Sequence, residues 1–313
     1  MNKDSKILIV GHNDIIEKSL YAYFQSSGYP HVFSSSQLRL NPTIQVSVYD
    51  FFAQAQPEYV FLASARSGGI EANQNNPGEF IYHNLESQNN IVYASWKFGV
   101  KKLLFVASSC IYPKMCPQPM KEEYLLTGEL EKTSEPYAVA KIAGVKLCQA
   151  FRKQHGLNAI VMVPATIYGP QADKDLETAH VMGALIEKFY KAFHRGEKEV
   201  IVWGSGAPRR EFLYVDDFVE ACVFLMTQYN GEEMVNVGSG HDVSIKELAE
   251  ILAEISGFRG TIRYDQTKPD GAMLKLLDHT RITKLGWTPK VDLKQGIQKT
   301  CEALGMRRYA PSK

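Results

Sequence analysis

The chain has 313 residues, of which 45% are apolar and 22% are charged, and its formal net charge is +1. This length predicts one large α/β domain with a smaller lobe and is ample for a hydrophobic core. Because the charge is nearly balanced and no long basic run occurs, we do not expect nucleic acid as a partner.

The first apolar run, Ile7–Val10, follows a short polar start. It is far too short for the core of a signal peptide or for a membrane span, so we expect a buried strand and no membrane association. The five cysteines are an odd set without a CxxC pair, which argues against a disulfide framework or a zinc site. We therefore expect no metal and predict a reducing, cytoplasmic location.

Strand-like runs alternate with helix-length segments through the first half of the chain. We predict strands at Ile7–Val10, Tyr59–Ala63, Lys102–Ala107 and Ala159–Val163, and helices at Ile15–Gln25, Phe80–Trp96 and Tyr137–Gln154. This alternation predicts βαβ units and a parallel sheet covered on both faces, which is a Rossmann-like, doubly wound α/β fold.

The pattern loosens beyond Gly169. Ser244–Ile255 is expected to be a helix, with Ser244 as N-cap and Glu247 completing a capping box, and Gly257–Asp278 contains short strand-like pieces. We predict a dinucleotide-binding domain over residues 1–165, with roughly residues 210–235 packing back on it. A smaller nucleotide-sugar-binding lobe is expected over residues 166–209 and 236–313.

A tyrosine and a lysine four residues apart carry the most specific chemical signal. Tyr137 and Lys141 begin a predicted helix and lie on one of its faces. An ammonium beside a phenol, whose usual pKa is about 10, would favour the phenolate and lower that pKa. Ser108, which lies 29 residues earlier, ends a predicted strand where open α/β sheets place ligands. The three residues predict proton exchange with an oxygen during hydride transfer, although the Tyr-Lys spacing alone also fits a buried tyrosine beside a surface lysine.

Seven segments, in order along most of the chain, resemble the GDP-L-fucose synthase family of extended short-chain dehydrogenases. They are Ser108–Lys114, Glu135–Gly144, Tyr168–Pro170, Val202–Gly206, Arg210–Leu213, Asn236–Gly238 and Lys268–Gly271. The resemblance implies an NADP-dependent enzyme that epimerises and reduces a GDP-4-keto-6-deoxy-hexose in one site.

The resemblance also implies which residues form the site. The catalytic set would be Ser108, Cys110, Tyr137, Lys141 and His180, with Cys110 and His180 carrying protons at C3 and C5 of the sugar. A thiol of pKa about 8.5 and an imidazole of about 6.5 can exchange such protons near neutrality. Substrate-binding candidates are Lys188, Trp203, Arg210, Asp270 and Lys275. Cofactor-binding candidates are Gly11, Asn13, Ile15, Ser36, Arg39, Ala63, Ser64, Ala65, Tyr137, Lys141, Pro164, Ile167 and His180.

The cofactor loop departs from the family pattern. The family type has Gly-x-x-Gly-x-x-Gly here, so that the backbone can approach a pyrophosphate at a helix N-terminus. Only Gly11 remains, and Asp14 and Glu17 replace the second and third glycines. We expect the Asp14 carboxylate and the bulk of Glu17 to weaken dinucleotide binding. A plain βα turn without a dinucleotide is the alternative. Arg39 could meet a 2′-phosphate, which favours NADP over NAD.

The main hypothesis is an NADP-dependent 3,5-epimerase and 4-reductase of a GDP-4-keto-6-deoxy-hexose. One alternative is an enzyme that only epimerises or only reduces a related GDP-sugar, such as a heptose. Another is a non-catalytic GDP-sugar-binding or partner subunit that has lost the dinucleotide. By analogy with this fold class, helices near Phe80–Trp96 and Tyr137–Gln154 would form a homodimer bundle.

Overall fold

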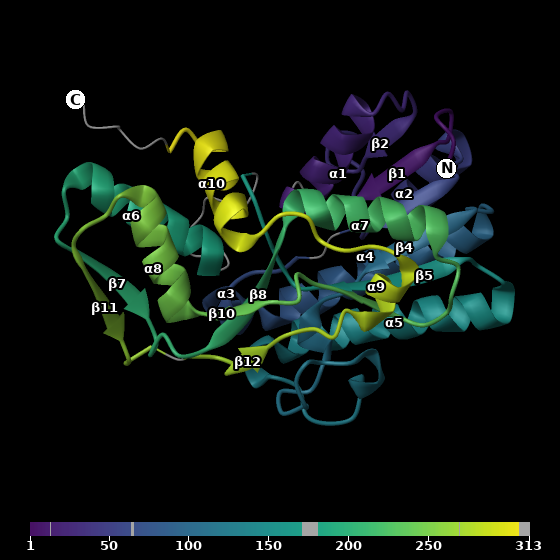
Figure 1. Cartoon of the computed structure of the whole chain (residues 1–313). Helices are drawn as coiled ribbons and strands as arrows, with labels where there is room; N and C mark the ends of the chain where they lie inside the picture. Colours follow the sequence, from purple (N-terminus) through teal and green to yellow (C-terminus); the bar gives the residue numbers. More distant parts are fainter. Residues whose placement is uncertain (13, 64–65, 171–180, 269, 307–313) are drawn as a thin grey trace.

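The computed structural model describes residues 1–12, 14–63, 66–170, 181–268 and 270–306. Its centre is a parallel six-stranded sheet in the order β2-β1-β3-β4-β5-β9 (Figure 1). The strands are β1 (Ile7–Val10), β2 (Val32–Ser34), β3 (Tyr59–Leu62), β4 (Lys102–Val106), β5 (Ala159–Pro164) and β9 (Val235–Val237). The predicted Rossmann-like sheet is thus confirmed, and parallel strands bring their carboxyl ends to one edge.

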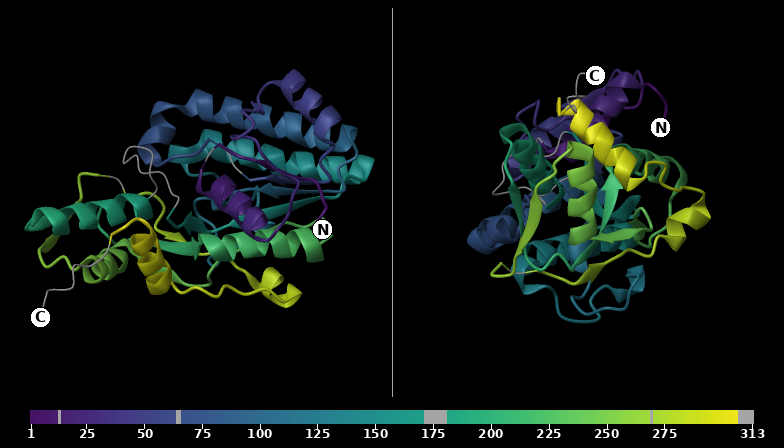
Figure 2. Two further views of the ribbon diagram at one scale, coloured as in Figure 1. Left: turned by 90° about the horizontal axis from the view of Figure 1, so that it is seen from above. Right: turned by 60° about the vertical axis from the view of Figure 1, so that its left-hand side comes forward.

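Helices cover both faces of this sheet, as Figure 2 shows from above. One layer contains α2 (Gln45–Ala55), α4 (Pro77–Lys97) and α5 (Glu135–His155), and the other contains α1 (Ile15–Ser26) and α7 (Val215–Gln228). Burial on both sides explains why β1 and β4 read as continuous apolar runs rather than alternating ones. The one lysine in these runs, Lys102, donates from Nζ to the carbonyls of Leu225, Met226 and Tyr229, at 3.0, 2.8 and 2.5 Å. It therefore caps the carboxyl end of α7.

A second core lies in the other lobe, where α6, α8 and α10 pack over short strands. Its buried members include Leu185, Phe189, Leu248, Leu252 and Ile297. The elements are β6 (Thr166–Tyr168), α6 (Val181–Arg195), β7 (Glu199–Trp203), β8 (Arg209–Tyr214), β10 (Asp242–Ser244), α8 (Ile245–Ser256), β11 (Thr261–Asp265), β12 (Leu274–Lys275) and α10 (Leu293–Ala303). α8 begins with the predicted capping box, in which Glu247 N donates to Ser244 Oγ and Ser244 N donates to the Glu247 side chain.

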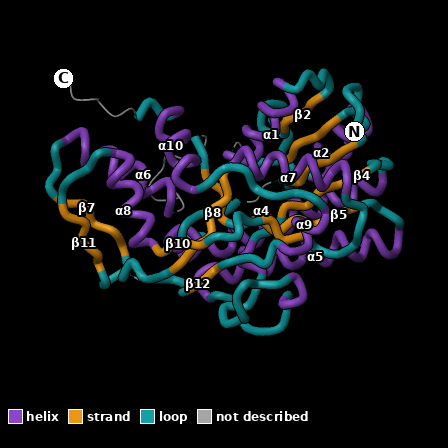
Figure 3. Tube along the Cα trace, viewed as in Figure 1, coloured by secondary structure: helices purple, strands orange, loops and turns teal. Residues whose placement is uncertain are grey.

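Two short helices and one long loop complete the first lobe. The short helices α3 (Ile70–Asn75) and α9 (Thr280–Leu285) pack on the first lobe, and Ile282 and Trp287 belong to its core. The loop after β4 bulges from the body and contains the turns η1 (Ser109–Ile111), η2 (Glu122–Tyr124) and η3 (Lys132–Ser134) (Figure 3). Asn236 of β9 anchors this loop: its Oδ1 accepts from Tyr112 at 2.5 Å and its Nδ2 donates to Met120 O at 2.9 Å.

In the part of the chain that the structure describes, no helix is long and apolar enough to cross a membrane.

Candidate active site

The site is centred on the carboxyl end of β4. Ser108 is the N-cap of η1, and its Oγ accepts from Cys110 N at 3.3 Å. The same hydroxyl hydrogen-bonds the side chains of Cys110 and Tyr137. A strand end, a single turn and the start of α5 therefore place a hydroxyl, a thiol and a phenol together, as the sequence predicted for Ser108 and Tyr137.

A lysine from the other lobe contacts the thiol. Lys275 of β12 lies with Nζ 3.4 Å from Cys110 Sγ, although the two residues are 165 positions apart. Burial opposes ionisation of the thiol, but the Lys275 ammonium and hydrogen bonds from Ser108 and Ser134 outweigh it and lower the pKa of Cys110. The sequence indicated Lys275 only as a substrate ligand and gave no role to Ser134. Pairings between distant elements leave no signal in local spacing.

Tyr137 has the opposite character. Burial, and then the nearby Cys110 charge, raise its pKa well above the usual value, and the Ser108 hydrogen bond only partly offsets them. The phenol is therefore protonated at neutral pH and can donate a proton. The expected lowering of this pKa by Lys141 is wrong in this structure.

The position of Lys141 explains why the pKa of Tyr137 is not lowered. Its side chain is 3% exposed and its Nζ donates to Val106 O at 2.7 Å. Burial lowers the pKa of Lys141 to about 7, so the group carries only part of a positive charge at neutrality. Lys141 lies on the predicted helix, one turn after Tyr137, but it is held by the strand instead of the phenol.

The phosphate end of the cleft is built around Gly11 and the start of α1. Asp14 is the N-cap of α1 and accepts from Glu17 N at 2.9 Å, so it has an ordinary helix-capping role. Glu17 is 1% exposed and accepts from Ser34 Oγ at 2.7 Å and from Ser36 N at 2.9 Å. A β-carbon on Gly11 would lie 2.5 Å from that of Glu17, which confirms that Glu17 takes up space between the helix and the sheet.

The other predicted cofactor residues lie at several places along the strand ends and the turns that follow them. Ala63 and Pro164 lie at the carboxyl ends of β3 and β5, Ile15 begins α1, and Ile167 is in β6. Arg39 is exposed in the turn after β2. Asn13, Ser64, Ala65 and His180 lie outside the described residues.

The predicted substrate residues form two groups. Arg210 is half-buried close to the site, and the charge of Cys110 acts on it, although burial lowers its pKa overall. Trp203 is 53% exposed and has Lys188 Nζ 5.2 Å and Lys268 Nζ 4.9 Å from its ring centroid. Lys188 also donates to Ile201 O at 3.1 Å. Asp270 accepts from Ser205 N and Oγ at 2.7 and 2.8 Å, so its visible role is to hold the loop after β7.

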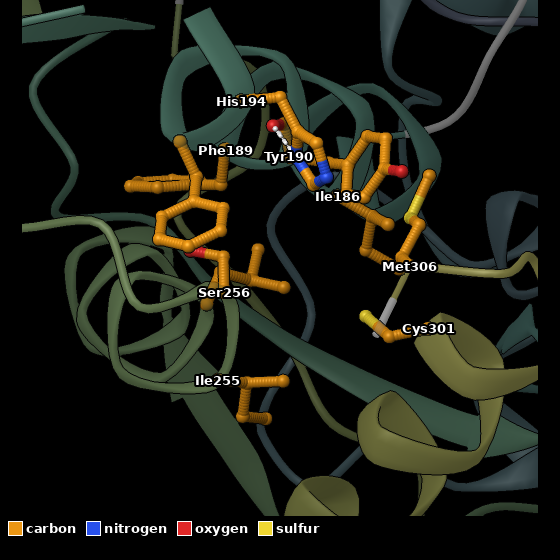
Figure 4. Close-up of a pocket in the computed structure, with 10 residues that line it drawn as sticks. Ile186, Phe189, Tyr190, His194, Ile255, Ser256, Cys301 and Met306 are labelled. Atoms are coloured by element: carbon orange, nitrogen blue, oxygen red, sulfur yellow. Dashed lines mark hydrogen bonds between the residues drawn. The ribbon is translucent and has the colours of Figure 1, made fainter. Parts of the chain in front are cut away.

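A second hollow, between α6, α8 and α10, lacks this chemistry (Figure 4). Most of the residues that line it are apolar, such as Ile186, Phe189 and Ile255. His194 Nδ1 lies 3.1 Å from Tyr190 O in its own helix. In contrast, a hollow lined by Cys110, Lys275 and the loop after β4 contains the thiol and the lysine that contacts it.

Known proteins are similar to this chain in sequence and in fold. Residues 7–238 match the NAD dependent epimerase/dehydratase family. GDP-L-fucose synthase 1 of Arabidopsis thaliana is 48% identical, over 96% of this chain and 93% of that protein. Two structures from Campylobacter jejuni are also similar. A GDP-6-OMe-4-keto-L-xylo-heptose reductase is 33% identical, with a TM-score of 0.92 over 96% of this chain and 98% of that one. A GDP-mannoheptose C4 reductase with NADP bound is 34% identical, with a TM-score of 0.90 over 97% and 99%.

Proposed function

This chain belongs to the NAD dependent epimerase/dehydratase family, and from that membership we propose that it is an NADPH-dependent 3,5-epimerase and 4-reductase of a GDP-4-keto-6-deoxy-hexose. The observation that carries the proposal is the contact of 3.4 Å between Cys110 Sγ and Lys275 Nζ, beside a protonated Tyr137. A pure reductase needs only a proton donor at the C4 oxygen. A thiol whose pKa is lowered, in the same site, adds a group that can act as a base on carbon.

Cys110 and Tyr137 would exchange protons with different atoms of the sugar. The C4 ketone acidifies the protons on C3 and C5, and the Cys110 thiolate can remove one of them. Ser108 and Tyr137 would hold the C4 oxygen and stabilise the charge that develops on it. Tyr137, whose raised pKa keeps it protonated, then gives its proton to that oxygen on reduction. A second carrier, His180, follows from the family resemblance.

NADPH fits the reaction end of the cleft. Tyr137 and Lys141 lie beside the carboxyl ends of β4 and β5, where a nicotinamide and its ribose would be held. When bound, NADPH supplies the hydride that reduces C4. The adenosine end fits less well because of the buried Glu17 carboxylate.

GDP would bind across the second lobe. Arg210 offers a guanidinium to the diphosphate, and the exposed ring of Trp203 offers a surface for stacking. We divide the chain accordingly into a dinucleotide-binding domain over residues 1–165 and roughly 210–235, and a sugar-nucleotide lobe over residues 166–209 and 236–313. The separate cores of the two lobes support this division in outline. The exceptions in the first core are Val237, Leu277, Ile282 and Trp287, and those in the second core are Phe212, Tyr214 and Val215.

We propose a homodimer formed through α4 and α5 and a cytoplasmic location. Tyr82 and Val139, on these helices, are 59% and 40% exposed, and all five cysteines are unpaired. Light scattering of the purified chain tests the dimer, and a monomeric mass at micromolar concentration would exclude it. Fractionation of the source cells tests the location.

The function is tested with GDP-4-keto-6-deoxy-mannose in D₂O. Without NADPH, the protein should introduce deuterium at C3 and C5, and with NADPH it should also consume the cofactor and form the C4 alcohol. The Cys110→Ser variant should lose exchange at least about 100-fold, because a serine hydroxyl is far harder to ionise, while still binding GDP.

Other outcomes select the alternatives. NADPH consumption without exchange in the wild type would make the protein a reductase only, a possibility that the two heptose reductase neighbours favour. GDP binding with neither reaction would leave a non-catalytic subunit.

A further inference from the structure

Glu17 reaches from α1 to the carboxyl end of β2. In Rossmann sheets this end receives the adenosine ribose and, in NADP, its 2′-phosphate. An acidic residue that discriminates between the two dinucleotides usually comes from the end of the second strand. Here that strand ends in Ser34, Ser35 and Ser36, and the carboxylate comes from the first helix.

The serines make an anion-binding cradle around this carboxylate. Glu17 Oε1 accepts from Ser34 Oγ at 2.7 Å, Ser35 Oγ at 3.1 Å and Ser36 N at 2.9 Å, and Oε2 accepts from Ser36 Oγ. Three hydroxyls and a backbone amide thus converge on one buried charge. Charge-assisted hydrogen bonds of this kind also hold phosphate groups.

The position of Gly11 explains why the carboxylate lies there. The Glu17 side chain passes so close to Gly11 that a β-carbon on the glycine would be 2.8 Å from Glu17 Oε2. Ser35 Oγ ties the same loop to the strand end, accepting from Gly11 N at 2.9 Å. The loop, the carboxylate and the strand end are therefore packed as one unit, with the side chain filling space that a glycine at position 17 would leave open.

We propose that the Glu17 carboxylate occupies the anion position of the cofactor cleft, so that Glu17 sets the affinity for NADPH and its discrimination from NADH. The inference rests on the dinucleotide use in the proposed function. A 2′-phosphate must either displace the carboxylate from its four donors or bind beside a like charge. A dinucleotide with a free 2′-hydroxyl meets a hydrogen-bond acceptor instead, so the carboxylate opposes NADPH more strongly than NADH.

The test is calorimetric binding of NADPH and NADH, without any sugar, to the wild type and to Glu17→Gln. Glutamine keeps the length of the side chain and removes its charge. We expect NADPH affinity to rise by about tenfold or more and NADH affinity to change by less than about threefold, because only NADPH brings a second anion to this point. Glu17→Gly, which also opens the space, should give the larger gain for NADPH.

A double substitution tests the cradle itself. In the Glu17→Gly background, Ser36→Ala should cancel much of the gain in NADPH affinity, because the donors that Glu17 releases would then hold the phosphate. GDP binding provides the control for folding, since its site lies in the other lobe. If Glu17→Gln is poorly folded, the comparison of Glu17→Gly with Glu17→Gly/Ser36→Ala still tests whether the serine donors can hold the phosphate of NADPH.

Three results would overturn the inference: equal gains for NADPH and NADH, weaker NADPH binding by both Glu17 variants, or no detectable dinucleotide binding by any variant that binds GDP. Deuterium exchange at C3 and C5 requires no dinucleotide. It therefore reports on the proposed function separately, and a protein can pass one test and fail the other.

Discussion

At the carboxyl end of β4, the chain retains a hydroxyl, a thiol and a phenol that face one another, whereas at the carboxyl end of β2 it has filled the matching space with its own carboxylate. Both strands belong to one parallel sheet, so both ends lie at the same edge of it. At the first, burial raises the pKa of Tyr137 and charge lowers that of Cys110. At the second, Glu17 accepts hydrogen bonds from Ser34, Ser35 and Ser36. The difference teaches that the groups for reaction chemistry and the groups expected to set cofactor affinity lie at different strand ends of one sheet, so substitutions can test them separately.

The largest expected effect is at the reaction end. Tyr137→Phe removes the proton donor and little volume, so NADPH-dependent reduction should fall about 1,000-fold while GDP-sugar affinity stays within about threefold. Steady-state NADPH oxidation and calorimetry measure the two quantities. Tyr23→Phe, at an exposed tyrosine of α1, is the control. Near wild-type reduction by Tyr137→Phe would remove Tyr137 from the chemistry.

A smaller effect is expected at Lys275, and it distinguishes the role of the Cys110 thiol from that of the Tyr137 phenol. Lys275→Met removes the ammonium beside Cys110, so the pKa of the thiol should rise, and less thiolate is then present at neutral pH. Deuterium exchange should fall about tenfold at pH 7 and recover as the pH is raised, because the rising limb of its pH profile moves to higher pH.

The exposed Lys284→Met is the matched control and should leave that profile in place. If Lys275→Met lowers exchange equally at every pH, Lys275 positions the substrate and does not tune the thiol.

The smallest effect lies at the phosphate end. Asp14→Ala removes the N-cap of α1 and should cost about 1 kcal/mol of unfolding free energy, as should Asp292→Ala at the N-cap of α10. Asp14→Asn keeps a capping oxygen and should cost less. Denaturant unfolding measures all three.

Neither Asp14 variant should change NADPH affinity as much as Glu17→Gln does, since the Asp14 carboxylate serves the helix. An Asp14 effect on NADPH larger than that of Glu17 would mean that the second glycine position, and not the third, limits binding.

The amino-acid sequence by itself determined the parallel sheet, its main helices and the capping box of α8, because these depend on apolar periodicity and on residues a few positions apart. It also predicted that Ser108, at the end of a strand, and Tyr137, at the start of a helix, share one site.

Only the tertiary structure decided the states of these groups. Lys275 reaches Cys110 across 165 residues, and Lys141 turns to a strand carbonyl instead of the phenol. Glu17 accepts hydrogen bonds from three serines at and just after the end of β2. Burial and charge act through space, where the distances between side chains depend on packing that no local spacing encodes.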